Sequence, residues 1–257
     1  MFRLSSIVFS VTSIWALADT SVTSAAPSVD ELRAKGAAFD QRFEASDALT
    51  FYLAAEKLDP KNATILTAIA RQYRYQMADT ADKGEKLRLG RIALSYSQRA
   101  AALAPNDAEA QLSVAITLGK MLPFLGSREQ VDASPRIKKS VDAALRLDAR
   151  NDVAWHILGR WHRVLADVSG LKRVLAGAIY GSLPKGSNEE AARALEKAVA
   201  LNPNRLMHYI ELGRVYAQMG RKDEARKFLN KGLSMPNLEK DDPETKARGR
   251  EALEKLR

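Results

Sequence analysis

The side chains in this sequence best suited to chemistry are arginines that recur three residues apart. Together with one histidine they form a predicted basic set: Arg71, Arg74, His156, Arg160, Arg163 and Arg214. A guanidinium offers N–H donors in a planar fork that matches two oxygens of a carboxylate or a phosphate. The set therefore predicts a site for an acidic peptide segment or a lipid headgroup. The alternative is that these arginines pair with Asp and Glu of adjacent helices.

Other kinds of reactive site find little support. The chain has no cysteine, which excludes thiolate nucleophiles and disulfides. Its histidines never stand four residues apart, the spacing that would place two rings on one metal ion. Gly181 and Gly186 are spaced as in a phosphate-binding loop, but Ser187-Asn188 replaces the Lys-Ser/Thr that such a loop requires. We therefore expect no metal, no cofactor and no enzymatic activity.

The elements that position the basic set come from an internal repeat. Four turn-like segments each end one apolar helical pattern and open the next: 57–63, 102–108, 146–152 and 200–206. Small and large apolar residues recur at fixed offsets from them, as with Leu212, Gly213 and Tyr216. This is the tetratricopeptide pattern of about 34 residues, a pair of closely packed antiparallel helices. The middle units are longer, so we expect insertions between their two helices.

This repetition predicts an all-α fold, a right-handed superhelix (solenoid) of about five tetratricopeptide-like helix pairs with inter-helix insertions. Residues 28–31 and 187–190 have the pattern of capping boxes, which start helices. Asp242-Pro243 predicts a last helix that caps the C-terminal end. The repeat domain is expected to span residues 28–257, with the basic set on the first helices that line the concave face of a solenoid.

The first residues have the pattern of a secretory signal. Residues 7–18 are apolar, Arg3 precedes them, and small residues stand at their end. We therefore expect residues 1–18 to be a signal peptide or an uncleaved anchor, followed by a flexible leader at 19–27. These features predict an exported protein, periplasmic or secreted. The alternatives are a membrane-anchored or a mitochondrial protein.

The stretch from 169 to 184 is apolar in a chain of net charge +9. Its apolar residues recur at helical spacing, while each interior glycine costs about 1 kcal/mol of helix stability relative to alanine, which favours a bend or a close contact. One interpretation is packing against the neighbouring repeat. The other is a lipid-facing wall, formed by Leu171, Val174, Leu175 and Ile179.

The order of these features resembles the regulator of microtubule dynamics family. The resemblance covers about residues 30–257 and rests on the long link at 76–100, the segment 155–204 with its insertion, and the exit at 233–236. Members of that family are associated with microtubules and with the mitochondrial surface, and one membrane-anchored branch is linked to phospholipid transfer through its repeat domain. The resemblance implies the repeat fold with these particular insertions.

Two functions follow as hypotheses. The first is a non-enzymatic scaffold whose concave face holds a protein or an acidic peptide. The second is a phospholipid-binding or lipid-transfer domain with an apolar cavity walled by residues 169–184. Nucleic acid would suit the net charge, but few aromatic side chains could stack on bases, so it is not expected as a partner. Microtubule association is implied by the resemblance alone.

Overall fold

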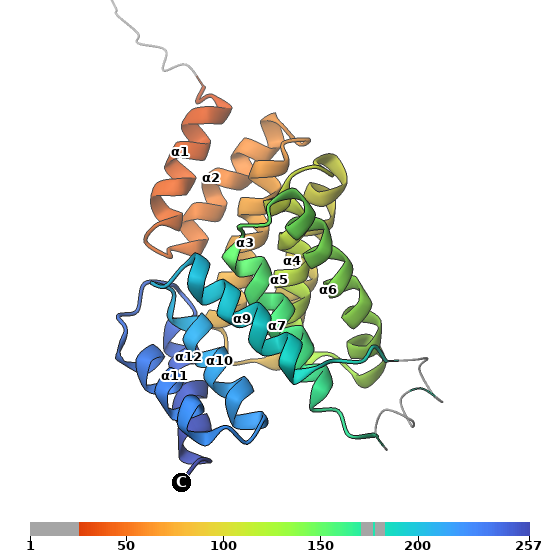
Figure 1. The fold of residues 1–257 in the computed structure, drawn as a ribbon. Helices are drawn as coiled ribbons and strands as arrows, with labels where there is room; N and C mark the ends of the chain where they lie inside the picture. The colour runs from red at the N-terminus through yellow and green to blue at the C-terminus, as the bar shows by residue number, and fades with distance from the viewer. Residues whose placement is uncertain (1–25, 171–176, 178–182) are drawn as a thin grey trace, which may run out of the picture.

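The computed structural model describes residues 26–170, 177 and 183–257, and these residues form helices without any strand. In chain order the helices are α1 (Val29–Asp40), α2 (Ala45–Leu58), α3 (Ala63–Asp79), α4 (Lys83–Leu103), α5 (Ala108–Met121), the 3-10 turn η1 (Leu122–Phe124), α6 (Ser127–Leu147), α7 (Asp152–Ala166), α9 (Asn188–Leu201), α10 (Leu206–Gln218), α11 (Lys222–Ser234) and α12 (Asp242–Glu254). They stack side by side as a helical solenoid (Figure 1), so the predicted all-α fold is confirmed.

Consecutive helices pack as pairs, each a first helix and a second helix. The pairs are α1 with α2, α3 with α4, α5 with α6, α7 with α9, and α10 with α11. First helices of successive pairs also touch, α3 with α5 and α7 with α10, and together they form the inner face of the solenoid. The last helix, α12, packs on α10 and α11 as the expected C-terminal cap.

Small residues let the two helices of a pair approach closely. A Cβ added at Gly159 of α7 would lie 2.6 Å from Cγ of Leu195 in α9. The equivalent Gly213 of α10 would place a Cβ 2.7 Å from Cγ of Leu229 in α11. Both leucines are fully buried, so these glycines are needed for the close packing that the repeat pattern predicts.

Insertions in the second and third pairs mostly lengthen helices. Helices α4 and α6 have 21 residues each, compared with 14 in α2 and in α9. Helix α6 also continues through Pro135, which lacks the N–H that a helix interior uses. The extra residues therefore extend the second helices of these pairs more than they form loops.

The predicted helix starts differ in detail. Ser28 and Glu31 form a complete capping box at α1, as predicted. At α9, Ser187 accepts a hydrogen bond from the backbone of Glu190, but the Glu190 carboxylate pairs with Arg193 rather than reaching back to the cap. The second box is therefore only half formed.

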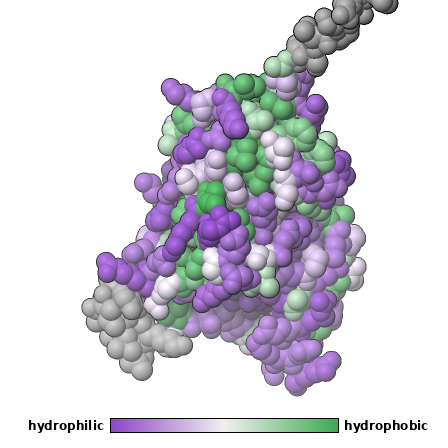
Figure 2. Space-filling view, turned by 180° about the vertical axis from the view of Figure 1, so that it is seen from behind, coloured by the Kyte–Doolittle hydropathy of each residue, from purple (hydrophilic) through white to green (hydrophobic). Residues whose placement is uncertain are grey.

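One face of the molecule is mainly polar, as Figure 2 shows. In Figure 2, apolar side chains gather toward the end of the molecule where the described chain begins, and polar ones cover most of the remaining surface. Within residues 26–170 and 183–257, no helix is long and apolar enough to cross a bilayer.

Candidate functional site

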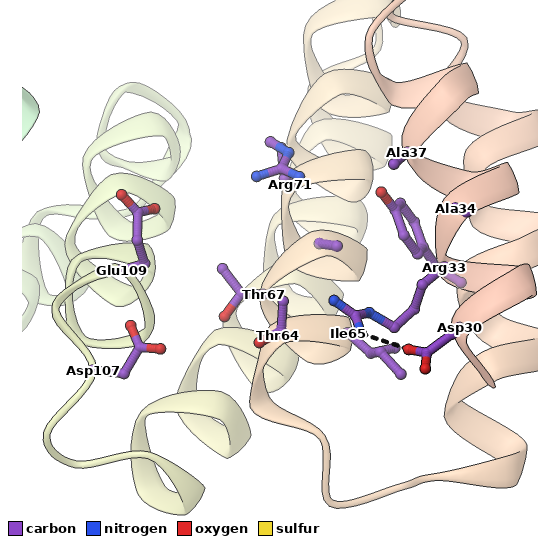
Figure 3. A pocket seen from close by; sticks show the side chains of 12 residues that line it. Asp30, Arg33, Ala34, Ala37, Thr64, Ile65, Thr67, Arg71, Asp107 and Glu109 are labelled. Carbon is purple, nitrogen blue, oxygen red and sulfur yellow. Dashed lines mark hydrogen bonds and ion pairs between the residues drawn. The ribbon is translucent and has the colours of Figure 1, made fainter.

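A groove on the inner face lies between α1, α3 and the start of α5. It is a hollow of about 530 Å³. Figure 3 shows Thr67 and Arg71 of α3 pointing into the space toward α5, and Glu109 and Asp107 facing them from α5. We call this the inner groove. Its size and its position on the first helices suit the binding of an extended segment.

The two arginines of the inner groove are already engaged with carboxylates. Arg33 pairs with Asp30 of the same helix at 2.9 Å. Arg71 donates from Nε and Nη2 to Oδ2 of Asp40, at 3.0 and 2.5 Å. Burial alone would lower the pKa of Arg71, but the hydrogen bonds and the charge of Asp40 raise it above its ordinary value. These guanidiniums therefore bring little free positive charge to the groove.

The carboxylates at the α5 side have no cationic partner among the described residues. Asp107 caps α5, with Oδ1 accepting from the N–H of Ala110 at 3.0 Å. Glu109 makes no ion pair or hydrogen bond with the described part of the chain. Because no cation there neutralises either group, the inner groove carries net negative charge on its α5 side.

Three members of the predicted basic set pair with acids, and two of these pairs join successive helix pairs. Arg71 of α3 binds Asp40 of α1, as above. Arg163 of α7 donates from Nε to Oε1 of Glu211 in α10, at 2.6 Å. Arg214, one turn after Glu211, donates to its other oxygen at 2.8 Å. For Arg71 and Arg163 this is the alternative in which the arginines pair with acids of adjacent helices, whereas Arg214 pairs within its own helix.

Glu211 is the centre of a buried charge network. Its side chain is 6% exposed and lies between Arg163 and Arg214. Burial would raise the pKa of this carboxyl, but the positive charges of Arg163 and Arg214 hold it well below its usual range. Glu211 therefore stays ionised inside the protein, and its arginines have a structural role.

Arg74 is buried without a carboxylate partner among the described residues. Its residue is 5% exposed, and Nη1 donates to the hydroxyls of Ser113 and Thr117 in α5, both at 3.0 Å. Burial, and then the charge of Arg71, lower its pKa to about 10. Arg74 thus links the second and third pairs through neutral groups and has little access to a ligand.

Arg160 differs from the other arginines of the set in having neither a carboxylate nor a hydroxyl partner among the described residues. It is half-buried on α7 and makes no hydrogen bond or ion pair with the described residues. Burial lowers the pKa of its guanidinium, while the charge of Glu211 acts in the opposite direction. A half-buried cation of this kind is suited to an anionic group supplied from outside.

His156 belongs to a buried histidine pair. Nδ1 of His208 lies 3.2 Å from Nδ1 of His156, and Nε2 of His208 lies 2.8 Å from Oδ2 of Asp152. Because the carboxylate can only accept, Nε2 of His208 donates to it, and Nδ1 then accepts from His156 when both rings are neutral. Burial lowers the pKa of both histidines. This pair joins α7 to α10, and His156 has little exposed surface for a ligand.

The predicted lipid-facing wall lies outside the described residues, since Leu171, Val174, Leu175 and Ile179 are all in the undescribed part. Just after it, a Cβ on Gly186 would lie 2.2 Å from the carbonyl oxygen of His162 and 2.6 Å from the nitrogen of Ala166. Close packing on the end of α7 therefore accounts for the second glycine of the segment that resembles a phosphate loop. Among the described residues, no three side chains could hold a metal ion together.

The acids that bind the arginines were missed by the sequence reasoning. Asp40 and Glu211 were not singled out, and neither were Asp107 and Glu109. One signal was available: Asp40, Arg74 and Arg163 each directly follow the last core residue of a first helix. Charged side chains at this position of the repeat contact the next helix pair. An alignment of the repeats would have shown an acid at this position in one repeat and a base in two others.

The fold and the inner groove define a class, the tetratricopeptide-like helical repeat proteins. A thermophilic tetratricopeptide repeat protein of Thermus thermophilus superposes with a TM-score of 0.64 at 19% identity, covering 88% of this chain and 99% of that one. PilF of Pseudomonas aeruginosa gives a TM-score of 0.54 at 15% identity, covering 89% and 91%. At these identities the likeness concerns the fold alone.

Within that class, the chain belongs to the regulator of microtubule dynamics family. The family profile described as "Regulator of microtubule dynamics protein 1-3" matches residues 28–257. Regulator of microtubule dynamics protein 1 of Mus musculus is 23% identical over 241 residues, 92% of this chain and 78% of the relative. Protein 2 of Homo sapiens is 26% identical over 180 residues, 68% and 43% respectively. The first curated relatives are matched over only 39 to 43% of their own length. The suspected family resemblance is confirmed.

The predicted location is wrong. The N-terminal pattern predicts export to the periplasm or outside the cell, but the relatives are animal proteins named as regulators of microtubules, which are structures of the eukaryotic cytosol. A short apolar run after an arginine is a weak signal because it depends on composition alone.

Proposed function

We propose that this protein is a binding scaffold that holds an extended segment of a partner protein in the inner groove. The repeat fold and the family both support a helical interaction scaffold. The observation that carries the proposal is the hollow of about 530 Å³ between α1, α3 and α5, on the face that helical solenoids use for binding. An extended segment can lie along three first helices without any change in their packing.

The charges of the inner groove favour a basic side chain in the partner. Asp107 and Glu109 face the groove without a cation from the described residues, whereas Arg33 and Arg71 already have carboxylates. A lysine or arginine beside these two acids would complete this charge pattern. An acidic segment, which the arginine-rich sequence predicts, would have to displace Asp40 from Arg71. Its best remaining contact is Arg160, where the acidic-peptide proposal still applies.

Two fluorescent peptides of equal length, one with lysines and one with glutamates at matching positions, test the chemistry of the groove. We expect the lysine peptide to bind and Glu109→Lys to weaken it roughly tenfold, about 1.4 kcal/mol. Asp223→Lys is the matched control, because it makes the same charge change at a side chain that is 98% exposed on α11. Fluorescence anisotropy gives both affinities.

The same two peptides distinguish a basic partner segment from an acidic one. If Glu109→Lys and Asp223→Lys weaken lysine-peptide binding equally, the loss is due to the net charge of the protein, and binding in the inner groove is refuted. Tighter binding of the glutamate peptide, lost in Arg160→Glu, would favour the acidic partner at Arg160 instead.

Other roles stay predictions. The phospholipid-binding alternative depends on a wall outside the described residues, and native mass spectrometry of the purified protein for bound lipid would test it. Association with microtubules is proposed from the names of the relatives, and co-sedimentation with polymerised tubulin would test that. The expectation that the protein is not an enzyme likewise remains a prediction.

A further inference from the structure

Three consecutive residues between α11 and α12 alternate in charge, and each meets an opposite charge in a different part of the solenoid. The ion pairs are Glu239 with Arg205 at 3.1 Å, Lys240 with Asp79 at 2.7 Å, and Asp241 with Lys120 at 2.6 Å. Asp79 ends α3 and Lys120 is near the end of α5. The ion pairs of Lys240 and Asp241 therefore join the segment before α12 to the second and third helix pairs. We call residues 239–241 the clasp.

The clasp is held in shape locally before it reaches across the molecule. Asp242 is 3% exposed, and its Oδ2 accepts from the backbone N–H groups of Leu238 and Glu239, both at 2.8 Å. Pro243 follows and fixes the backbone at the start of α12. Because this turn is already formed, closing the ion pairs costs less conformational entropy than ordering a free loop would.

Open space lies beside these ion pairs. A second hollow, of about 600 Å³, lies between the clasp segment, the turn that joins α1 to α2, and the end of α3. Leu238 borders this hollow and is 60% exposed. Since the two sides are separated by open space, the clasp joins them mainly through charge.

The shortest of the three ion pairs, Lys120 with Asp241, is partly buried. The side chain of Lys120 is 24% exposed and that of Asp241 is 37% exposed. Burial lowers the pKa of Lys120, while the charge and hydrogen bonding of Asp241 act in the opposite direction. Removing Asp241 would leave a cation next to Arg74, so this pair should matter more than a fully exposed one.

We propose that Glu239, Lys240 and Asp241 form an electrostatic clasp that closes the solenoid on itself and sets how far its inner face can open. The closing role concerns this chain alone. The consequence for a partner rests on the proposed function: a segment bound along the inner face has to fit the closed curvature or release the clasp. Since the pairs use both signs of charge, one partner segment with mixed charges can compete for them.

Distances measured between two spin labels test the clasp. The chain has no cysteine, so Gln41→Cys, at the end of α1, and Asn230→Cys, on α11, allow two specific spin labels at exposed positions. We expect Lys120→Glu to lengthen or broaden the distance distribution, and Lys120→Glu with Asp241→Lys to restore it by exchanging the charges. Lys138→Glu is the control, because it breaks an ion pair of similar exposure within α6 alone.

A second charge exchange guards against a variant that fails to fold. Lys240→Glu should open the solenoid, and adding Asp79→Lys to it should close the solenoid again. Far-UV circular dichroism checks that the helical content of each variant is unchanged. If both single reversals keep the wild-type distances at physiological salt, the clasp is refuted. If Lys138→Glu changes the distances as much as Lys120→Glu does, the effect is general and the clasp is again refuted.

The lysine peptide separates this inference from the proposed function. With the clasp open we expect its affinity to change about two- to fivefold, the range that follows from the free energy of one half-exposed ion pair. Changed distances with unchanged affinity would keep the closing role and refute the effect on binding. Absence of peptide binding in every variant would refute the proposed function and leave the distance result standing.

Discussion

Individual charged residues on the first helices connect one helix pair to the next. Asp40 reaches Arg71, Arg74 reaches two hydroxyls of α5, and Arg163 reaches a glutamate of α10. Each of these side chains lies at the end of a core pattern, where the helix turns from its own partner toward the following pair. An ionised group at this place is buried by the neighbour, so it needs a partner there whether or not a ligand binds.

Glu211 gives the clearest stability test of these links. Glu211→Gln keeps the shape of the side chain but removes the charge that balances Arg163 and Arg214. Leaving buried cations without their carboxylate should cost about 3 kcal/mol of unfolding free energy. Urea denaturation followed by circular dichroism measures it. Glu254→Gln, at an exposed site of α12, should stay within about 0.5 kcal/mol, and an equal loss in both variants would contradict the buried network.

The buried histidines predict how stability depends on pH. Burial keeps the pKa of His156 and of His208 below the ordinary value of 6.5, so the folded protein holds them neutral. As the pH falls through 6.5, the unfolded chain gains protons that the folded one does not, and stability is lost. It is fully present above this range and falls by up to about 1.4 kcal/mol per pH unit for each histidine.

His156→Gln should reduce this pH dependence. Urea unfolding at pH values above and below 6.5 measures the change in slope. Asp152 and Glu211 have a lowered pKa, so their contribution is lost only at more acidic pH, in a separate range. A wild-type slope that persists in the variant would show that His156 is protonated freely in the folded protein.

At the scale of helices, the sequence predicts the elements well because the apolar residues of each helix recur at helical spacing. The alternation of small and large apolar residues sets which face packs on the partner helix, and the helix pairs appear where this pattern puts them. The insertions were harder to predict. Inserted residues have no equivalent position in the 34-residue pattern, so the pattern does not predict their structure. In the second and third pairs they continue a helix that tertiary packing stabilises.

Gly186 tests the connection between α7 and α9. Gly186→Ala would press a methyl group against the backbone of His162 and Ala166, and it should destabilise the protein by about 1–3 kcal/mol. Gly119→Ala is the matched comparison inside α5, where nothing lies within 4 Å of an added Cβ. That change should stabilise by up to about 1 kcal/mol. Thermal unfolding distinguishes them, and destabilisation of similar size in both would contradict the close packing at Gly186.

At the scale of the whole molecule, the segment before the last helix contacts the second and third helix pairs. The chain between α11 and α12 reaches α3 and α5 through Lys240 and Asp241, although Lys120 and Asp241 are 121 positions apart. An open array of helix pairs would leave its inner face accessible along its full length. Here the inner groove at the start of α1, α3 and α5 stays open, while the other end of the same helices lies against the clasp.

The helix pairs, the C-terminal cap and the family could be predicted from the sequence, because they follow from periodic apolar residues and turn segments that are local in the chain. The sequence also predicted a basic set that includes Arg71, Arg163 and Arg214, and the role of this set on the inner face stays a prediction. The packing of distant helices was needed to bring Arg71 to Asp40 and Arg163 to Glu211, to leave Arg160 without such a partner among the described residues, and to place residues 239–241 against other parts of the solenoid. The reason is physical: the partner of a charge is set by distances between helices far apart in the sequence, and these depend on how successive pairs are rotated when they pack.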